Sequence, residues 1–171
     1  MKYIKKKLTI EKVSLEYVAK KYGSPAYCYS YNQLKKNVLK FQKSFSKIKP
    51  LICFAVKANN NTKLLNEIGK LGLGADVVSK GELMAALKSK IDPKKIVFSG
   101  VGKSEEELKI AINKKILLIN CESESEAKLI NALAKKLRKK VDIGFRLNPN
   151  VDAKTHKNIS TGKADNKFGL S

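Results

Sequence analysis

A lysine stands at the end of an apolar run, in Phe54-Ala55-Val56-Lys57-Ala58-Asn59. If this run is a strand of a parallel sheet, Lys57 lies at the carboxyl-terminal edge, where barrel enzymes keep their chemistry. A desolvated amine loses its proton more readily, and a neutral amine can attack the carbonyl group of a substrate or a cofactor. A lysine that only reaches solvent is the alternative reading, and position alone does not exclude it.

Two acidic residues follow in the next apolar segment. Asp76 lies inside Gly74-Ala75-Asp76-Val77-Val78, where a carboxylate is costly unless it is paired. Asp76 could therefore face Lys57 across neighbouring strand ends, while Glu82 stands at the start of the following helix. A cap or turn carboxylate is the alternative for both acids.

An arginine occupies a later apolar segment, Phe145-Arg146-Leu147. Because almost all other basic residues of the chain are lysines, the arginine at position 146 indicates a binding role that needs a planar guanidinium. A structural pair with a carboxylate such as Asp76 remains the alternative. The polar loop 151–167 that follows contains the single histidine, His156, and its length favours a functional role.

Two other motifs predict no site of their own. Ser99-Gly100-Val101-Gly102-Lys103-Ser104 resembles a phosphate-binding loop, but the pattern needs glycine at 97 and Val97 is there. A tight turn with a helix N-cap is therefore expected. The three cysteines are far apart and without a CxxC pair, so with one histidine the sequence predicts buried thiols and no metal site.

The elements that must position these residues alternate regularly. Strands are expected at 51–56, 74–78, 96–99, 116–120 and 141–147, with helices at 62–71, 80–88, 105–113 and 123–138. The spacing of about 20 to 25 residues and the continuous apolar strands are typical of βα units in a parallel sheet. An open doubly wound sheet and a (β/α)8 barrel both fit, and the absence of a GxGxxG pattern favours the barrel.

The chain is short for a complete barrel, which needs roughly 250 residues. The 171 residues predict an incomplete (β/α)8 barrel of about five units, truncated at its C-terminus. Upstream, a helix at 14–21, a strand at 26–29 and a helix at 31–46 are expected. We therefore predict an N-terminal segment, 1–30, and a partial barrel, 31–171. No secretory signal or membrane-spanning segment is evident.

The net charge of +21 comes almost wholly from lysine, since only Arg138 and Arg146 of the 36 basic residues are arginines. Lysines spread along the whole chain indicate a solvated surface rather than a nucleic-acid interface, which concentrates arginine and charge on one face. A basic nucleic-acid-binding protein is the alternative.

Several stretches together resemble one enzyme family. These are 54–59, 74–82 and, above all, 146–156 with 159–162 and 167–169, which are similar to diaminopimelate decarboxylases of the alanine-racemase-like barrel class. The resemblance implies pyridoxal 5'-phosphate as cofactor and decarboxylation of meso-2,6-diaminopimelate to L-lysine and CO2. It also implies a cytoplasmic homodimer. Sister decarboxylases of ornithine, arginine or carboxynorspermidine are the alternatives, and loop 148–167 discriminates against them.

The resemblance also implies roles for individual residues. Lys57 would carry the cofactor covalently, and Asp76 and Arg146 would lie beside it. Glu82 would be a nearby acid, and the rim loop would contain His156, Thr161 and Gly162 without firm roles.

The chain departs from the family at Ser99-Gly100-Val101-Gly102-Lys103, where the family commonly has His-Gly-Asn-Asn-Lys, so only Lys103 is carried over there. The strand at 26–29 would belong to a β-domain completed by a missing C-terminal part. We therefore expect the 171 residues to be inactive alone.

Overall fold

The computed structural model describes residues 1–48, 50–151, 154, 156, 159, 161–163 and 167–170. The chain forms two compact units, Met1–Pro50 and Leu51–Ser171, each with its own internal contacts. This boundary differs from the division after residue 30 that the sequence indicates, and helix α2 (Tyr31–Ser44) belongs to the first unit.

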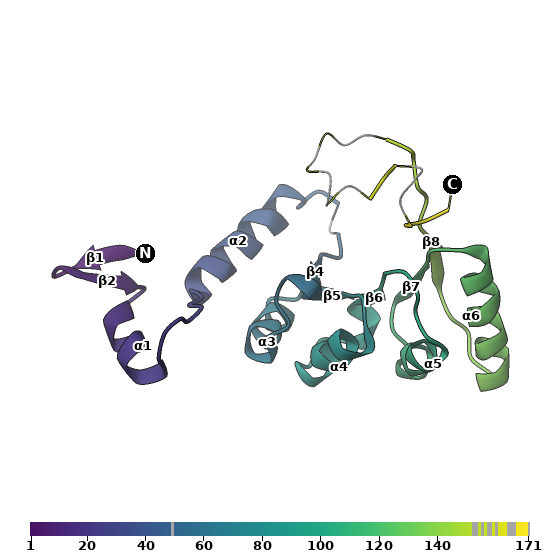
Figure 1. Cartoon of the computed structure of the whole chain (residues 1–171), viewed down its shortest axis with the longest axis horizontal. Coiled ribbons are helices and arrows are strands. Elements are labelled where there is room, and N and C mark those ends of the chain that lie inside the picture. Colours follow the sequence, from purple (N-terminus) through teal and green to yellow (C-terminus); the bar gives the residue numbers. More distant parts are fainter. Residues whose placement is uncertain are drawn as a thin grey trace. The chain divides into compact units, whose positions relative to one another are not determined.

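The first unit contains a small antiparallel sheet of β1 (Lys2–Ile4), β2 (Lys7–Ile10) and β3 (Val13–Ser14), followed by α1 (Leu15–Tyr22). These elements are purple in Figure 1. The carboxylate of Glu11, in the turn after β2, accepts hydrogen bonds from the Ser30 hydroxyl (2.7 Å) and the Asn32 amide (2.9 Å). The start of α2 is thereby fixed to the sheet.

The expected strand at 26–29 is wrong for this structure, because this stretch forms no strand. A strand is stable only when a neighbour completes its backbone hydrogen bonds, and no described segment pairs with this one. Tyr27 is 92% exposed there.

The second unit is a five-stranded parallel sheet in the order β4-β5-β6-β7-β8, which confirms all five expected strands. The strands are shorter than the apolar runs, because the backbone pairing ends before the runs do. In order, β4 to β8 are Cys53–Ala55, Gly74–Val77, Ile96–Phe98, Leu118–Cys121 and Ile143–Phe145. Single 3-10 turns follow β4 and precede β6, at Val56–Ala58 and Pro93–Lys95.

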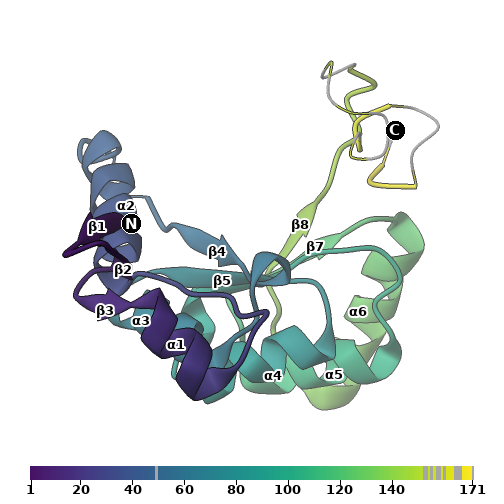
Figure 2. The same ribbon diagram turned by 60° about the vertical axis from the view of Figure 1, so that its left-hand side comes forward.

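Four helices connect the strands: α3 (Thr62–Lys70), α4 (Lys80–Lys88), α5 (Glu105–Lys114) and α6 (Glu124–Leu137). They all cover the same face of the sheet (Figure 2). A doubly wound sheet reverses its strand order and places helices on both faces. Sequential order with helices on one face is the wall of a barrel, so the second unit is part of a (β/α)8 barrel.

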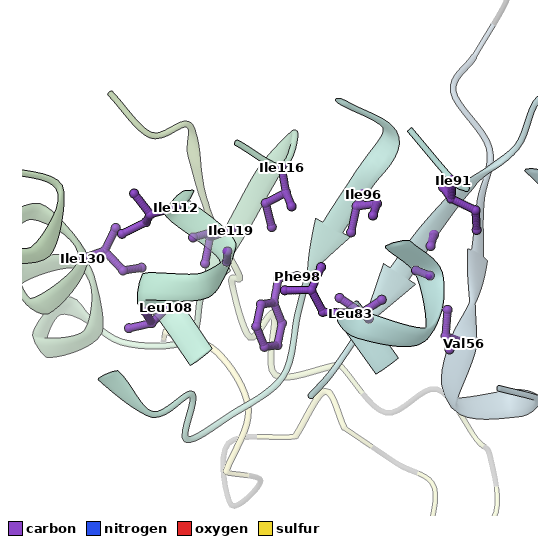
Figure 3. Packing of buried hydrophobic residues seen from close by; sticks show 14 of the residues in the cluster. Val56, Leu83, Ile91, Ile96, Phe98, Leu108, Ile112, Ile116, Ile119 and Ile130 are labelled. Atoms are coloured by element: carbon purple, nitrogen blue, oxygen red, sulfur yellow. The ribbon is translucent and has the colours of Figure 1, made fainter. Parts of the chain in front are cut away.

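The hydrophobic core lies between the sheet and these helices. Ile96 and Phe98 of β6 are fully buried there, and Phe98 lies between Leu83 of α4 and Leu108 of α5 (Figure 3). The intervening Val97 is only partly buried. Successive side chains of a strand point to opposite faces, so the residues between these core positions face the concave side of the sheet.

The helices begin at serine caps that recur along the chain. Ser79, Ser104 and Ser123 each accept a hydrogen bond from the backbone amide of the glutamate three residues later. Ser104 is the helix N-cap that the sequence predicts, and together with Glu107 it forms a complete capping box. Ser79 and Ser123 lie two residues after the ends of β5 and β7, and Ser104 lies six residues after the end of β6.

We predict that Ser104→Ala lowers the free energy of unfolding by about 1 kcal/mol, because it leaves an amide of the first helical turn without its acceptor. Chemical denaturation followed by circular dichroism measures the change. Ser104→Asp restores a capping oxygen and should recover most of the loss. Equal stability of the alanine variant and the parent would contradict the prediction.

Candidate functional site

The site is an open cavity of about 640 Å³ at the carboxyl-terminal ends of the strands. Polar residues from five consecutive strand ends line it together with a few apolar ones: Lys57, Asp76, Val78, Ser99, Gly100, Val101, Asn120, Glu122, Phe145, Arg146 and Phe168. A smaller hollow of about 330 Å³ lies around Ile112, Arg138 and Asp142, and it contains none of the predicted site residues.

Lys57 lies in the turn that follows β4. The preceding Val56 is fully buried and anchors this turn in the core, while Lys57 is exposed at the rim of the cavity. The register pairs Ala55 with Asp76, so Lys57 lies two residues beyond the neighbour of that acid. The two residues line the same cavity, although no hydrogen bond or ion pair connects them among the described residues.

Asp76 belongs to a hydrogen-bonded chain across three strand ends. The Ser99 hydroxyl donates to Asp76 Oδ1 (2.7 Å), and the Asn120 side-chain amide donates to Ser99 Oγ (3.1 Å). Asp76 is only partly buried, and within the described part of the chain its Oδ2 has no partner. One oxygen is thus fixed by the protein and the other can accept a ligand proton.

Sequence reasoning assigned Ser99 and Asn120 no role in the site. Both lie next to apolar strand residues, as Asp76 does, and this shared position is the signal that could have found them.

Two thiols lie near this network. Burial raises the pKa of Cys53, and the negative charge of Asp76 raises it further. Burial also raises the pKa of Cys121. Both thiols are therefore protonated at neutral pH and poorly nucleophilic, which fits their predicted role as small apolar residues. The prediction of a buried thiol is wrong for Cys28, which is exposed in the first unit.

Arg146 pairs with Glu122 rather than with Asp76, which corrects the partner named as an alternative from the sequence. Its Nη1 donates to Glu122 Oε1 (3.1 Å), and its guanidinium carbon lies 4.7 Å from the centroid of the Phe168 ring. Glu122 is 7% exposed, and sequence reasoning missed it because it directly precedes a helix cap and resembles a surface acid.

Lys103 is a buried cation with all three donors in use. Its ammonium group donates to Gly100 O (2.8 Å), Asn120 O (2.7 Å) and Glu126 Oε1 (2.7 Å). These bonds tie the loop after β6 to the end of β7 and to the start of α6. The loop ends in the Ser104 helix cap that the sequence predicts.

The remaining predicted residues lie apart from the described cavity lining. Glu82 Oε2 accepts from the Val78 amide (2.9 Å), which stabilises the loop before α4. His156 and Gly162 accept backbone hydrogen bonds from Ile159 and Val151, and Thr161 is exposed. The roles of these residues stay predictions, since residues 152–153, 155, 157–158, 160 and 164–166 of the same loop lie outside the described residues.

The described ranges contain no group of three or more histidine, cysteine, aspartate or glutamate side chains placed to hold a metal ion. None of their helices is long and apolar enough to span a membrane.

The sheet, its helices and this cavity define a partial barrel with an amine at the carboxyl-terminal edge of its strands. The family model "Pyridoxal-dependent decarboxylase, pyridoxal binding domain" matches residues 31–171. The chain belongs to this family.

Within this family, the chain is similar to diaminopimelate decarboxylases. The chain is 49% identical to the diaminopimelate decarboxylase of Vibrio cholerae over 96% of its own length and 39% of the relative's. It resembles the crystal structure of the Helicobacter pylori diaminopimelate decarboxylase complexed with L-lysine, with a TM-score of 0.88, 45% identity and coverage of 91% of this chain and 40% of that one.

The diaminopimelate decarboxylase of M. jannaschii gives a TM-score of 0.90 with 39% identity, covering 99% of this chain and 40% of that one. A chlorella virus arginine decarboxylase shares the fold alone, with a TM-score of 0.60 and 20% identity over 70% of this chain and 32% of that one. The chain spans about 40% of the length of the diaminopimelate decarboxylases that it matches.

We predict that Lys103→Met destabilises the protein by about 3 kcal/mol, because it leaves the carboxylate of Glu126 and two carbonyl groups without their donor. Lys128→Met is the matched control, since Lys128 forms only an exposed pair with Glu124, and it should cost less than about 0.5 kcal/mol. Denaturant unfolding measures both. Similar losses in the two variants would contradict the buried network.

Proposed function

We propose that this chain forms the amine-bearing wall of the active site of a pyridoxal-phosphate-dependent decarboxylase acting on meso-2,6-diaminopimelate, with L-lysine and CO2 as products. The observation that carries the proposal is the convergence of Lys57, Asp76 and Arg146, from three different strand ends, on one cavity. The similarity to diaminopimelate decarboxylases over nearly the whole chain supports the choice of substrate.

The residues present suit the cofactor. Lys57 offers a primary amine at the rim for its aldehyde carbon, Asp76 offers a free carboxylate oxygen for a protonated group, and Arg146 offers guanidinium donors for an anionic one. The chemistry that pyridoxal phosphate supplies when bound is an electron sink for the electron pair left on the substrate's α-carbon after the carboxyl group departs.

The chain's own residues prepare the site for this chemistry. The buried Val56 fixes the backbone beneath Lys57, so the exposed amine stays within reach of the cavity. Ser99 holds one oxygen of Asp76 and thereby orients the other. The partly buried Phe168 ring shields one side of the Arg146 guanidinium from water, which strengthens the interaction of that cation with an anion.

The resemblance supports three further proposals about the whole protein. The protein acts as a homodimer and resides in the cytoplasm. The segment 1–30 packs on a β-domain. We also propose that Glu82 lies near the bound cofactor and that His156, Thr161 and Gly162 lie in the loop at the rim of the active site.

We predict that pyridoxal phosphate, added below equimolar amounts and trapped with borohydride, labels Lys57 in preference to the other lysines. Peptide mass spectrometry locates the reduced adduct. Lys57→Ala should abolish this adduct, whereas Lys63→Ala, which removes an exposed lysine from α3, should leave it unchanged. Labelling spread evenly over the surface lysines would refute the role of Lys57 and favour the reading of a lysine-coated binding protein.

The substrate can be tested in a chimera. These 171 residues replace the matching portion of the Vibrio cholerae relative, and CO2 release is measured with meso-diaminopimelate, ornithine and arginine. We expect release from meso-diaminopimelate alone and its loss with Lys57→Ala. A chimera that prefers ornithine or arginine would transfer the assignment to a sister decarboxylase.

A further inference from the structure

Glu122 connects two parts of the rim that are distant in sequence. Its Oε1 accepts from Arg146 Nη1 (3.1 Å), and its Oε2 accepts from the backbone amide of Gly169 (2.9 Å). The side chain is 5% exposed, so both bonds form largely out of water, where bonds to a charged acceptor are strongest. A single carboxylate thus holds the guanidinium and the 168–169 segment.

The backbone reinforces this connection. Leu170 donates its amide to Arg146 O (2.7 Å), and Asn148 donates its amide to Leu170 O (2.6 Å). Gly169 has a φ of +76°, and a Cβ added there would lie 2.8 Å from Arg146 O. Only glycine therefore allows this close approach.

The two hydrogen bonds to residue 122 require a carboxylate at that position. Both groups that face it are N–H donors, so both of its oxygens must act as acceptors. Glutamine has the same shape but only one acceptor oxygen, and its amide group would face one of the two donors. Glu122→Gln must therefore break one of the two connections.

We propose that Glu122 is a positioning residue, which fixes the Arg146 guanidinium at the cavity only while the 168–169 segment is docked. Docking of this segment and orientation of Arg146 are then one event, because the same carboxylate serves both and the Phe168 ring lies against the guanidinium. This inference rests on the proposed function, in which Arg146 faces the cofactor.

The test uses the fact that the chain has only two arginines, Arg138 and Arg146. Phenylglyoxal modifies arginine, and mass spectrometry gives the rate at each site, so Arg138 serves as an internal reference. We expect Glu122→Gln to raise the rate at Arg146 several-fold and to leave Arg138 unchanged. Glu124→Gln, which removes an exposed carboxylate two residues away, should change neither rate.

A second readout follows the segment itself. Glu122→Gln should accelerate tryptic cleavage between Lys167 and Phe168, and the affinity for pyridoxal phosphate, measured by absorbance, should fall about tenfold with the loss of one charged hydrogen bond. Gly169→Ala keeps both charged residues and displaces only the turn, so it should also expose Arg146. If the Glu122→Gln variant loses its helical circular dichroism signal and is therefore unfolded, the Gly169→Ala variant tests the positioning role in its place.

The outcomes separate the two proposals. Unchanged Arg146 reactivity in both variants overturns the positioning role, even if pyridoxal phosphate protects Arg146 in the parent. Equal acceleration at Arg138 and Arg146 in Gly169→Ala also overturns it, because it indicates general unfolding. If Arg146 is exposed by both variants but pyridoxal phosphate neither protects it nor labels Lys57, the connection stands and the proposed function fails.

Discussion

The alternation of side chains along the parallel strands is the constraint on which the rest of this structure depends. In β5 and β7, Ala75, Val77 and Ile119 are buried among the helices, and the residues between them face the other way. Because adjacent strands are in parallel register, Asp76 and Asn120 come to the same concave face, where Ser99 connects them. A shift of one residue in any strand would move its polar side chain into the core.

Buried charge is tolerated at this edge because each charged group has several partners. Lys103 uses three acceptors, and Glu126 accepts from both Lys103 and the Glu122 backbone amide. Such networks cost desolvation energy and do not by themselves stabilise a protein. Their effect here is geometric, since they connect loops that follow different strands and so fix the shape of the cavity floor.

Much of the fold follows from the sequence alone, because the apolar runs are distinct and serine caps mark the helix starts. The placement of Lys57, Asp76 and Arg146 at one cavity was predictable for the same reason, since each stands at or near the end of such a run. Glu122 was not, because its role depends on a guanidinium 24 residues away and an amide 47 residues away. The expected strand at 26–29 failed because β-propensity carries no information about whether a partner strand is present.

The serine-capped helices have an electrostatic consequence for the cavity. The amino ends of α4, α5 and α6 all lie at the edge that carries the site, and the partial positive charges of aligned peptide dipoles would there attract anions. Glu82, Glu107 and Glu126 occupy these same ends and offset that field with carboxylates of their own. These three helices therefore contribute little to the attraction of a negatively charged ligand. The attraction falls to the amine of Lys57, the guanidinium of Arg146 and the amino end of α3, which has no acidic residue in its first turn.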